Sequence, residues 1–464
     1  MKALKTVLFM TMLSLFGSGC ALMRPTDPYA AVAIPERPEN KTDAPLRQST
    51  NLPPDDIDSL TLDQCIETAL ANNPDIQAAL HELDAAHARY RQARSALLPS
   101  LRIESGYDRY TNDQRVLSPQ GAGDAGVFSD QLLRAEAVLT VPLFSGGRTY
   151  NDLRAADHER RAQEYRTQLR SDDLVFAVSR LYYTILGFEK RIQSVQQSIE
   201  AIESHQRRVE SMIEAKKAAR VDLLRTNARL ANLQQNMLIL RNEHATLRRQ
   251  LAATMATDIG SQPLAMRAPV DTLLTLHSDT IVEHALGSRG DYRAAREQLE
   301  AQARRVDIAR GAFAPTLAAK SGYGIRSDMD GSYEPGGSAG LSLSMPLFEG
   351  GRNAAKLAEQ RANMAAQQNG LKALQLRIGV EIKAVVMDIE AARERMETAR
   401  VEIEAAKEGL RIENVKYEQG KGTISDVLVA QADLLQAETN LDEAFTAYAI
   451  AHARLQLVSG GLSQ

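Results

Sequence analysis

The chain has 464 residues, a formal net charge of −4, 44% hydrophobic residues and 25% charged residues. This apolar content is enough for a packed fold, and the lack of a basic excess argues against nucleic acid as a partner. Two cysteines exclude a disulfide scaffold and a zinc-ribbon cluster. Aromatic residues make up only 5%, whereas Ala, Gln, Glu, Arg and Leu dominate long stretches, a composition typical of long helices or coiled coil.

The N-terminus has the pattern of a secretion signal. Basic residues precede an apolar run at 7–16 that is too short to cross a bilayer as a permanent helix. Small residues then lead to Cys20, so we expect residues 1–19 to be a lipoprotein signal peptide and Cys20 to be acylated. The lipobox is imperfect, because Gly17 stands where Leu is usual. An ordinary signal peptide without acylation is the alternative.

The segment after Cys20 is rich in proline. Seven prolines fall within residues 20–59, so we predict an extended N-terminal tether rather than a helix. Helical periodicity begins at Thr61, a suitable helix N-cap. Cys65 lies in that first helix and is interpreted as a small buried apolar residue.

The remainder of the chain repeats itself. The strand start at Pro99 recurs at Pro315, an offset of 216 residues, and the motif Pro-Leu-Phe-x-Gly-Gly-Arg at Pro142 recurs at Pro346, an offset of 204 residues. The second copy is therefore shorter between the two motifs, as expected for a difference in exposed loops. The expected organisation is a first repeat at 60–255, a linker at 256–279 and a second repeat at 280–464.

Four segments between these motifs alternate apolar and polar residues with period 2. Such alternation over about ten residues is typical of a membrane β-strand with one wet face. Soluble hairpins that rest on helices would show the same pattern, so this alternative stays open. The predicted strands span about 100–111, 131–143, 316–327 and 337–347.

After each Gly-Gly-Arg the period changes to that of a helix. Apolar residues follow a heptad seam from Leu174 to Ile213 and, in the same phase, from Ile378 to Tyr417. Each copy should therefore form a very long helix, a tight turn and a second long helix. The first long helix would extend about 100 Å at the usual rise per residue.

Four strands are too few for a closed barrel, and an open sheet edge cannot face lipid, so several chains would have to share one barrel. Over residues 60–460 the sequence resembles the TolC-type outer-membrane efflux protein family, in its lipoprotein branch. The resemblance rests on the two duplicated motifs and on the helix-turn sequence Gly-Lys-Gly-Thr-Ile-Ser-Asp-Val-Leu at 420–428. It implies a mainly helical fold with membrane β-structure. Three chains would form a 12-stranded barrel continued by a 12-helix periplasmic coiled-coil tunnel, with the linker at its equator.

The resemblance also implies a function. The homotrimer would be a passive exit duct of a tripartite efflux or type I secretion system, with an iris-like gate at the periplasmic tip. It would be lipid-anchored in the bacterial outer membrane and would extend into the periplasm. Its partners would be outer-membrane lipid, a periplasmic adaptor protein and an inner-membrane pump of the RND or ABC type. The exported substrate and the pump class are left open.

A periplasmic adaptor lipoprotein and a structural coiled-coil lipoprotein are the alternatives, but neither explains two hairpins together with two long strand pairs. No nucleophile elbow, P-loop or dinucleotide fingerprint is present, and the eight histidines lack metalloprotease spacing. We therefore expect no enzyme activity, no cofactor and no metal.

Two groups of residues are candidate functional positions. The first is expected to bend each strand into its helix and contains Pro142, Gly146, Gly147, Pro346, Gly350 and Gly351. Anion binding at a helix start is the alternative for these glycines. The second group forms the tip turn and contains Gly420, Gly422 and Thr423.

Carboxylates at the tip are the candidate pore gate. By the resemblance, Asp426 would line the pore, and Asp222 is its equivalent in the first copy. Three such carboxylates around one axis would attract cations and raise one another's pKa. Ordinary helix capping is the alternative for both residues. Candidates for docking an adaptor hairpin are Val221, Leu223, Leu224, Thr423 and Val427, with coiled-coil core packing as the alternative.

Overall fold

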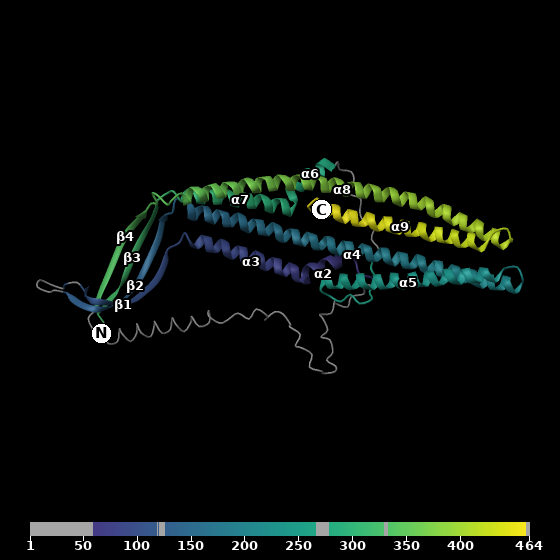
Figure 1. The fold of residues 1–464 in the computed structure, drawn as a ribbon, viewed down its shortest axis with the longest axis horizontal. Coiled ribbons are helices and arrows are strands. Elements are labelled where there is room, and N and C mark those ends of the chain that lie inside the picture. Colours follow the sequence, from purple (N-terminus) through teal and green to yellow (C-terminus); the bar gives the residue numbers. More distant parts are fainter. Residues whose placement is uncertain (1–58, 118, 120–125, 266–277, 329–332, 461–464) are drawn as a thin grey trace, which may run out of the picture. The chain divides into compact units, whose positions relative to one another are not determined.

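A computed structural model describes residues 59–117, 119, 126–265, 278–328 and 333–460 (Figure 1). The predicted signal peptide, the acylation site Cys20 and the tether up to residue 58 lie outside the described residues. The part of the predicted linker at 266–277 lies outside them as well.

Two copies of one element order make up the described chain. The first copy contains α2 (Leu62–Asn72), α3 (Pro74–Ser95), β1 (Ser100–Leu117), β2 (Val127–Phe144), α4 (Arg148–Glu214) and α5 (Arg220–Met255). The second contains α6 (Ser278–Ser288), α7 (Gly290–Gly311), β3 (Thr316–Ser327), β4 (Tyr333–Ser344), α8 (Arg352–Glu418) and α9 (Ile424–Val458). The long helices α4 and α8 both have 67 residues, which confirms the internal repeat.

Local sequence explains where the helices begin. Thr61 caps α2 in a capping box with Gln64, and Asn73 caps α3, which begins at Pro74. Both long helices start after a glycine with positive φ, Gly147 at 77° and Gly351 at 84°. Across the described residues, no helix combines the length and the hydropathy needed to cross a membrane.

The four strands form one antiparallel sheet in the order β1-β2-β3-β4. The pairing of β2 with β3 joins the two repeats, and β1 and β4 are the sheet edges within this chain. Side chains directly opposite one another in an antiparallel pair share a face. Ile103, Ala137 and Tyr323 form one row on the apolar face, whereas Arg134 and Arg326 lie opposite each other on the polar face.

Three strands differ in their bounds from the expected ones. β1 continues to Leu117, beyond the expected end at 111, β2 spans Val127–Phe144 rather than 131–143, and β4 spans Tyr333–Ser344 rather than 337–347. The Pro335-Gly336-Gly337 segment had the chemistry of a turn, but it pairs with β3 as part of β4. An edge strand tolerates proline, because one side of its backbone needs no partner within the sheet.

The helices pack through the predicted heptad seams. Figure 1 shows α4 beside α5 and α8 beside α9, and α4 also contacts α3, α7 and α9. Seam residues of α4 such as Val178, Ile185 and Ile202 are fully buried, as are Ile382 and Ile389 of α8. The hydroxyl oxygen of Tyr182 lies 2.9 and 2.6 Å from the carbonyl oxygens of Leu60 and Ala265, which share its one proton. These bonds fix the described part of the linker against α4.

Candidate functional site

The two hairpin turns have the same backbone geometry. Lys216, between α4 and α5, and Gly420, between α8 and α9, both adopt positive φ, at 59° and 70°. The next backbone N–H in each turn closes it: Lys217 donates to the carbonyl of Met212 and Lys421 to that of Lys416, both at 2.8 Å. Glycine adopts this conformation without strain, so only the second turn has the favoured residue.

Asp426 is part of a complete capping box. Its carboxylate accepts hydrogen bonds from the Thr423 backbone N–H at 3.0 Å and from the Thr423 hydroxyl at 2.7 Å. The Thr423 hydroxyl oxygen accepts in turn from the Asp426 N–H at 3.3 Å. The hydrogen bonds from Thr423, followed by the charge of Lys416, lower the pKa of the Asp426 carboxyl. The exposed carboxylate is therefore ionised and faces solvent at the tip.

Asp222 is held less firmly at the equivalent place. Its carboxylate accepts from the Ala219 N–H at 3.4 Å, and Ala219 has no side-chain acceptor to complete the box. Within one chain, helix capping accounts for the positions of both Asp222 and Asp426. The mutual rise in pKa expected for a ring of carboxylates would require other copies of the chain.

The two hairpins are joined near their ends by contacts between the repeats. The Arg225 guanidinium donates to the Ser425 hydroxyl at 2.8 Å, and Arg208 on α4 forms an ion pair with Glu418 on α8. Beneath these contacts lies a buried apolar group that we term the tip cluster. It consists of Val209, Tyr417, Ile424 and Val427. No local sequence pattern predicts these contacts, because the paired residues lie about 200 positions apart in the chain.

The structure separates the candidate docking residues into two sets. Val221 and Leu224 are exposed, with 48% and 58% of their surface accessible, and Thr423 is exposed as well. Val427 is buried in the tip cluster and Leu223 packs against it. The core-packing alternative therefore holds for Val427 and Leu223 within this chain. Val221, Leu224 and Thr423 stay candidates for contact with an adaptor hairpin.

The strand-to-helix turns are made by glycines rather than prolines. Pro142 still lies within β2, beside a bulge, and Pro346 lies just after β4 has ended. The reversal follows at Gly146 and Gly147, with φ of 65° and 77°. Gly146 is also tightly packed, since an added Cβ would lie 2.5 Å from the carbonyl oxygen of Gly311 in α7. This contact joins the first repeat to the second.

The equivalent glycines of the second copy have no such neighbour. Gly350 and Gly351 adopt φ of 61° and 84°, and an added Cβ at either would meet no atom of the described residues within 4 Å. The same turn is therefore packed in one repeat and open in the other.

Metal and thiol chemistry find little support in the described part of the chain. Across those residues, no group of three or more His, Cys, Asp or Glu side chains is arranged to hold a metal ion. Cys65 is fully buried, and burial raises the pKa of its thiol to about 12. The thiol is therefore protonated at neutral pH and is a core residue, as its place in α2 suggested.

Comparison with known proteins agrees with this geometry. The family model for outer membrane efflux proteins matches residues 65–257 and 281–461, one segment for each repeat. The chain belongs to the outer membrane efflux protein family. Members of this family are outer-membrane channel proteins and not enzymes.

Individual relatives are distant but match over most of their length. Outer membrane protein TolC of Vibrio cholerae is 23% identical, over 85% of this chain and 90% of that protein. The pyoverdine export outer membrane protein OpmQ of Pseudomonas aeruginosa is 25% identical, over 81% of this chain and 80% of that protein. Among solved structures, the outer-membrane channel OprN has a TM-score of 0.76 at 21% identity, covering 86% of this chain and 90% of that chain.

Proposed function

We propose that three copies of this chain form a passive outer-membrane duct, with a shared 12-stranded barrel and a periplasmic tunnel of 12 helices. Cys20 would carry the lipid anchor. The duct would receive cargo from an inner-membrane pump through a periplasmic adaptor. No energy-coupling motif is present in the sequence, so the pump would supply the driving force.

This proposal is supported mainly by packing surfaces of the second repeat that lack, among the described residues, the partners that the equivalent surfaces of the first repeat have. Within the chain, the first repeat joins the second through β2 with β3, α4 with α7, and α4 with α9. The repeat makes β4 equivalent to β2 and α8 equivalent to α4, so the second repeat offers the same surfaces again. Their counterparts, β1, α3 and α5, belong to the first repeat at the other edge of the chain. A further copy can supply them, and continued addition closes a ring.

The open glycine turn and an exposed apolar stripe support this closure. Gly350 and Gly351 lack the neighbour that Gly146 has in α7. On α8, four large apolar residues at heptad spacing are each about two-thirds or more exposed: Leu376, Val380, Met387 and Val401. Such a stripe on a long helix is typical of a coiled-coil seam that lacks its partner.

The sheet has the two faces that a barrel wall needs. Leu101, Ile103, Leu341 and Leu343 are exposed on its apolar face, where lipid would cover them. The opposite face carries both signs of charge, for example the ion pair between Arg134 and Asp108 at 2.8 Å. This polar face would line the lumen.

The hairpin tips would form the periplasmic gate. Ionised Asp426 side chains from three copies would narrow and charge the opening, with Asp222 as a second candidate. The contacts of Arg225 with Ser425 and of Arg208 with Glu418 would hold the two hairpins of each chain together. Val221 and Leu224, exposed at the tip, are the candidates for contact with the adaptor.

Negative-stain electron microscopy of the mature protein in detergent tests the assembly. We expect particles with threefold symmetry, a short detergent-covered end and a long hollow stalk. The same sample should form ion-conducting channels in planar lipid bilayers. Single rods without a detergent belt, and no conductance, would instead indicate a periplasmic coiled-coil protein.

A further inference from the structure

A cavity of about 330 Å³ is lined by four helices that lie beside one another: α3, α4, α7 and α8. Four arginines from three of the helices line it: Arg89, Arg160, Arg166 and Arg305. One acidic side chain, Glu159, is present in the wall. In the proposed duct, this cavity would face the lumen.

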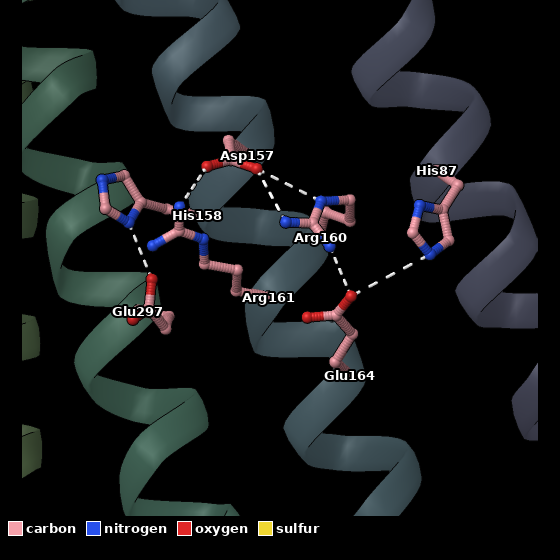
Figure 2. A network of polar contacts seen from close by, with 7 residues as sticks. All are labelled: His87, Asp157, His158, Arg160, Arg161, Glu164 and Glu297. Carbon is pink, nitrogen blue, oxygen red and sulfur yellow. Dashed lines mark hydrogen bonds and ion pairs between the residues drawn. The ribbon is translucent and has the colours of Figure 1, made fainter.

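Two of the four arginines are already neutralised. The guanidinium of Arg305 forms an ion pair with Glu159. Figure 2 shows Arg160 held between Asp157, at 2.9 Å, and Glu164. A further carboxylate next to the wall, that of Glu82, accepts from the Gln163 amide and pairs with Arg170, both at 3.2 Å.

The other two arginines are available to a ligand. Within the described part of the chain, Arg89 has no ion-pair or hydrogen-bond partner. Arg166 makes only a long contact of 3.4 Å with the side-chain oxygen of Gln163. Arg89 lies on α3 and Arg166 on α4, so the two free guanidinium groups reach the cavity from different helices.

The cavity also contains an unused hydrogen-bond acceptor. Gln367 of α8 lines the cavity, and its Oε1 atom is buried without a partner among the described residues. A buried carbonyl oxygen is stabilised when an N–H or O–H group donates to it. A ligand that fits these three groups would carry anionic groups for the two guanidinium groups and an N–H or O–H donor for the Gln367 oxygen.

We propose that this cavity binds small anions that carry carboxylate or phosphate groups and a hydroxyl or N–H donor. Arg89 and Arg166 would hold the anionic groups, and Gln367 would accept the hydrogen bond. Because both arginines are exposed, solvent and salt screen their charges, and binding would be weak enough to release a molecule in transit. The inference rests on the proposed function insofar as the anion reaches the cavity through the duct.

Two tricarboxylates can test the role of Gln367 separately from that of the two arginines. Citrate and tricarballylate carry the same three carboxylates, but only citrate has a hydroxyl. Calorimetric titration of the full-length protein in detergent at low ionic strength should show citrate binding more tightly than tricarballylate. Gln367→Leu should remove this difference. Inorganic phosphate tests whether a compact anion also occupies the site. Equal binding of citrate and tricarballylate by the unmodified protein would exclude the role of Gln367.

A pair of arginines on one helix supplies the matched control. Arg166→Gln should weaken citrate binding about fivefold, as expected for one partly screened charge-assisted hydrogen bond. Arg161 lies on the same helix but does not line the cavity, and it pairs with Asp157 at 2.8 Å (Figure 2). Arg161→Gln removes the same charge and should leave citrate binding unchanged. Equal weakening by both variants would reveal a general charge effect and overturn the proposal.

The binding and conductance measurements distinguish the two proposals. Channels in bilayers without citrate binding would reject the anion site and leave the duct intact. Citrate binding that depends on Arg166, in a protein that forms no channels, would reject the duct and retain the site. Absence of both would reject both.

Discussion

The carboxylate of Asp426 has two separable properties, its hydrogen bonds and its charge. It accepts two hydrogen bonds from Thr423 and so closes the first turn of α9. It is also exposed, and those hydrogen bonds keep its pKa low. Helix capping needs only the acceptor atoms, whereas a pore gate would need the negative charge. An amide substitution can therefore tell the two roles apart.

We predict that Asp426→Ala and Asp426→Asn both raise single-channel conductance and reduce cation preference in planar bilayers. Only Asp426→Ala should also destabilise the tip, because Asn keeps an acceptor for the Thr423 N–H. If Asp426→Asn leaves conductance and selectivity at their original values, Asp426 is a helix cap and no part of a gate.

At the scale of elements, the two hairpins meet around a buried histidine. His205 on α4 is 5% exposed, and its ring centre lies 5.3 Å from that of Tyr417 on α8. Its Nε2 atom has no hydrogen-bond partner among the described residues. Burial, and then the charge of Arg208, lower the pKa of His205, although Glu418 opposes this shift. Neutral imidazole therefore suits the packed hairpins better than imidazolium.

A pH dependence of stability follows. As pH falls below the ordinary histidine pKa of 6.5, the unfolded chain binds a proton more readily than the folded chain does. The contribution of His205 to stability should be highest above that pH and decline until the lower pKa of folded His205 is passed. Asp442, whose pKa burial raises to about 6, contributes in the opposite direction. Thermal melts in detergent at pH 5.5 and 7.5 should therefore be compared between proteins with and without His205.

A matched pair of histidine variants tests this assignment. His205→Gln should reduce the loss of stability at low pH, because the titrating group is gone. His81→Gln removes an exposed histidine on α3 and should keep the pH dependence of the unmodified protein. A His205→Gln profile identical to that of the unmodified protein would assign the pH effect to other groups.

At the scale of the whole molecule, the proposed assembly depends on the edges and exposed surfaces of one chain. β1 and β4 are the sheet edges of the described chain, and the stripe on α8 is exposed along much of its length. A long apolar stripe in water favours association. Assembly should therefore depend on this stripe more than on the charged surface of the same helix.

We predict that Val401→Glu weakens assembly, because Val401 is 71% exposed in one chain but would be buried between copies. Burying an unpaired carboxylate costs several kcal/mol in total. Size-exclusion chromatography with light scattering should show a shift from trimer to smaller species. Arg395→Gln makes the same change in net charge at an exposed position of α8 outside the stripe, and it should leave the trimer intact. An unaffected trimer in Val401→Glu would exclude the stripe from the interface.

Much of the fold could be predicted because its signals are local or repeated. The two repeats could be predicted because equivalent motifs recur along the chain, at offsets of 216 and 204 residues. Heptad spacing predicted α4 and α8, and period-2 alternation predicted the strands and their two faces. The turn at Gly420 and the cap formed by Thr423 and Asp426 depend on a few adjacent residues, so they too could be inferred from sequence.

Other features depended on which distant segments meet, and only the tertiary structure decided them. Arg225 and Ser425 are 200 residues apart, and Gly311 contacts Gly146 from the other repeat. Val427, expected as a docking candidate, is core because α4 and α8 cover it. Pro335 and the two glycines after it are residues typical of a turn, but their pairing with β3 makes them part of an edge strand. Sequence periodicity fixes which face of an element is apolar, but not which other element covers that face, because contacts through space leave no local pattern.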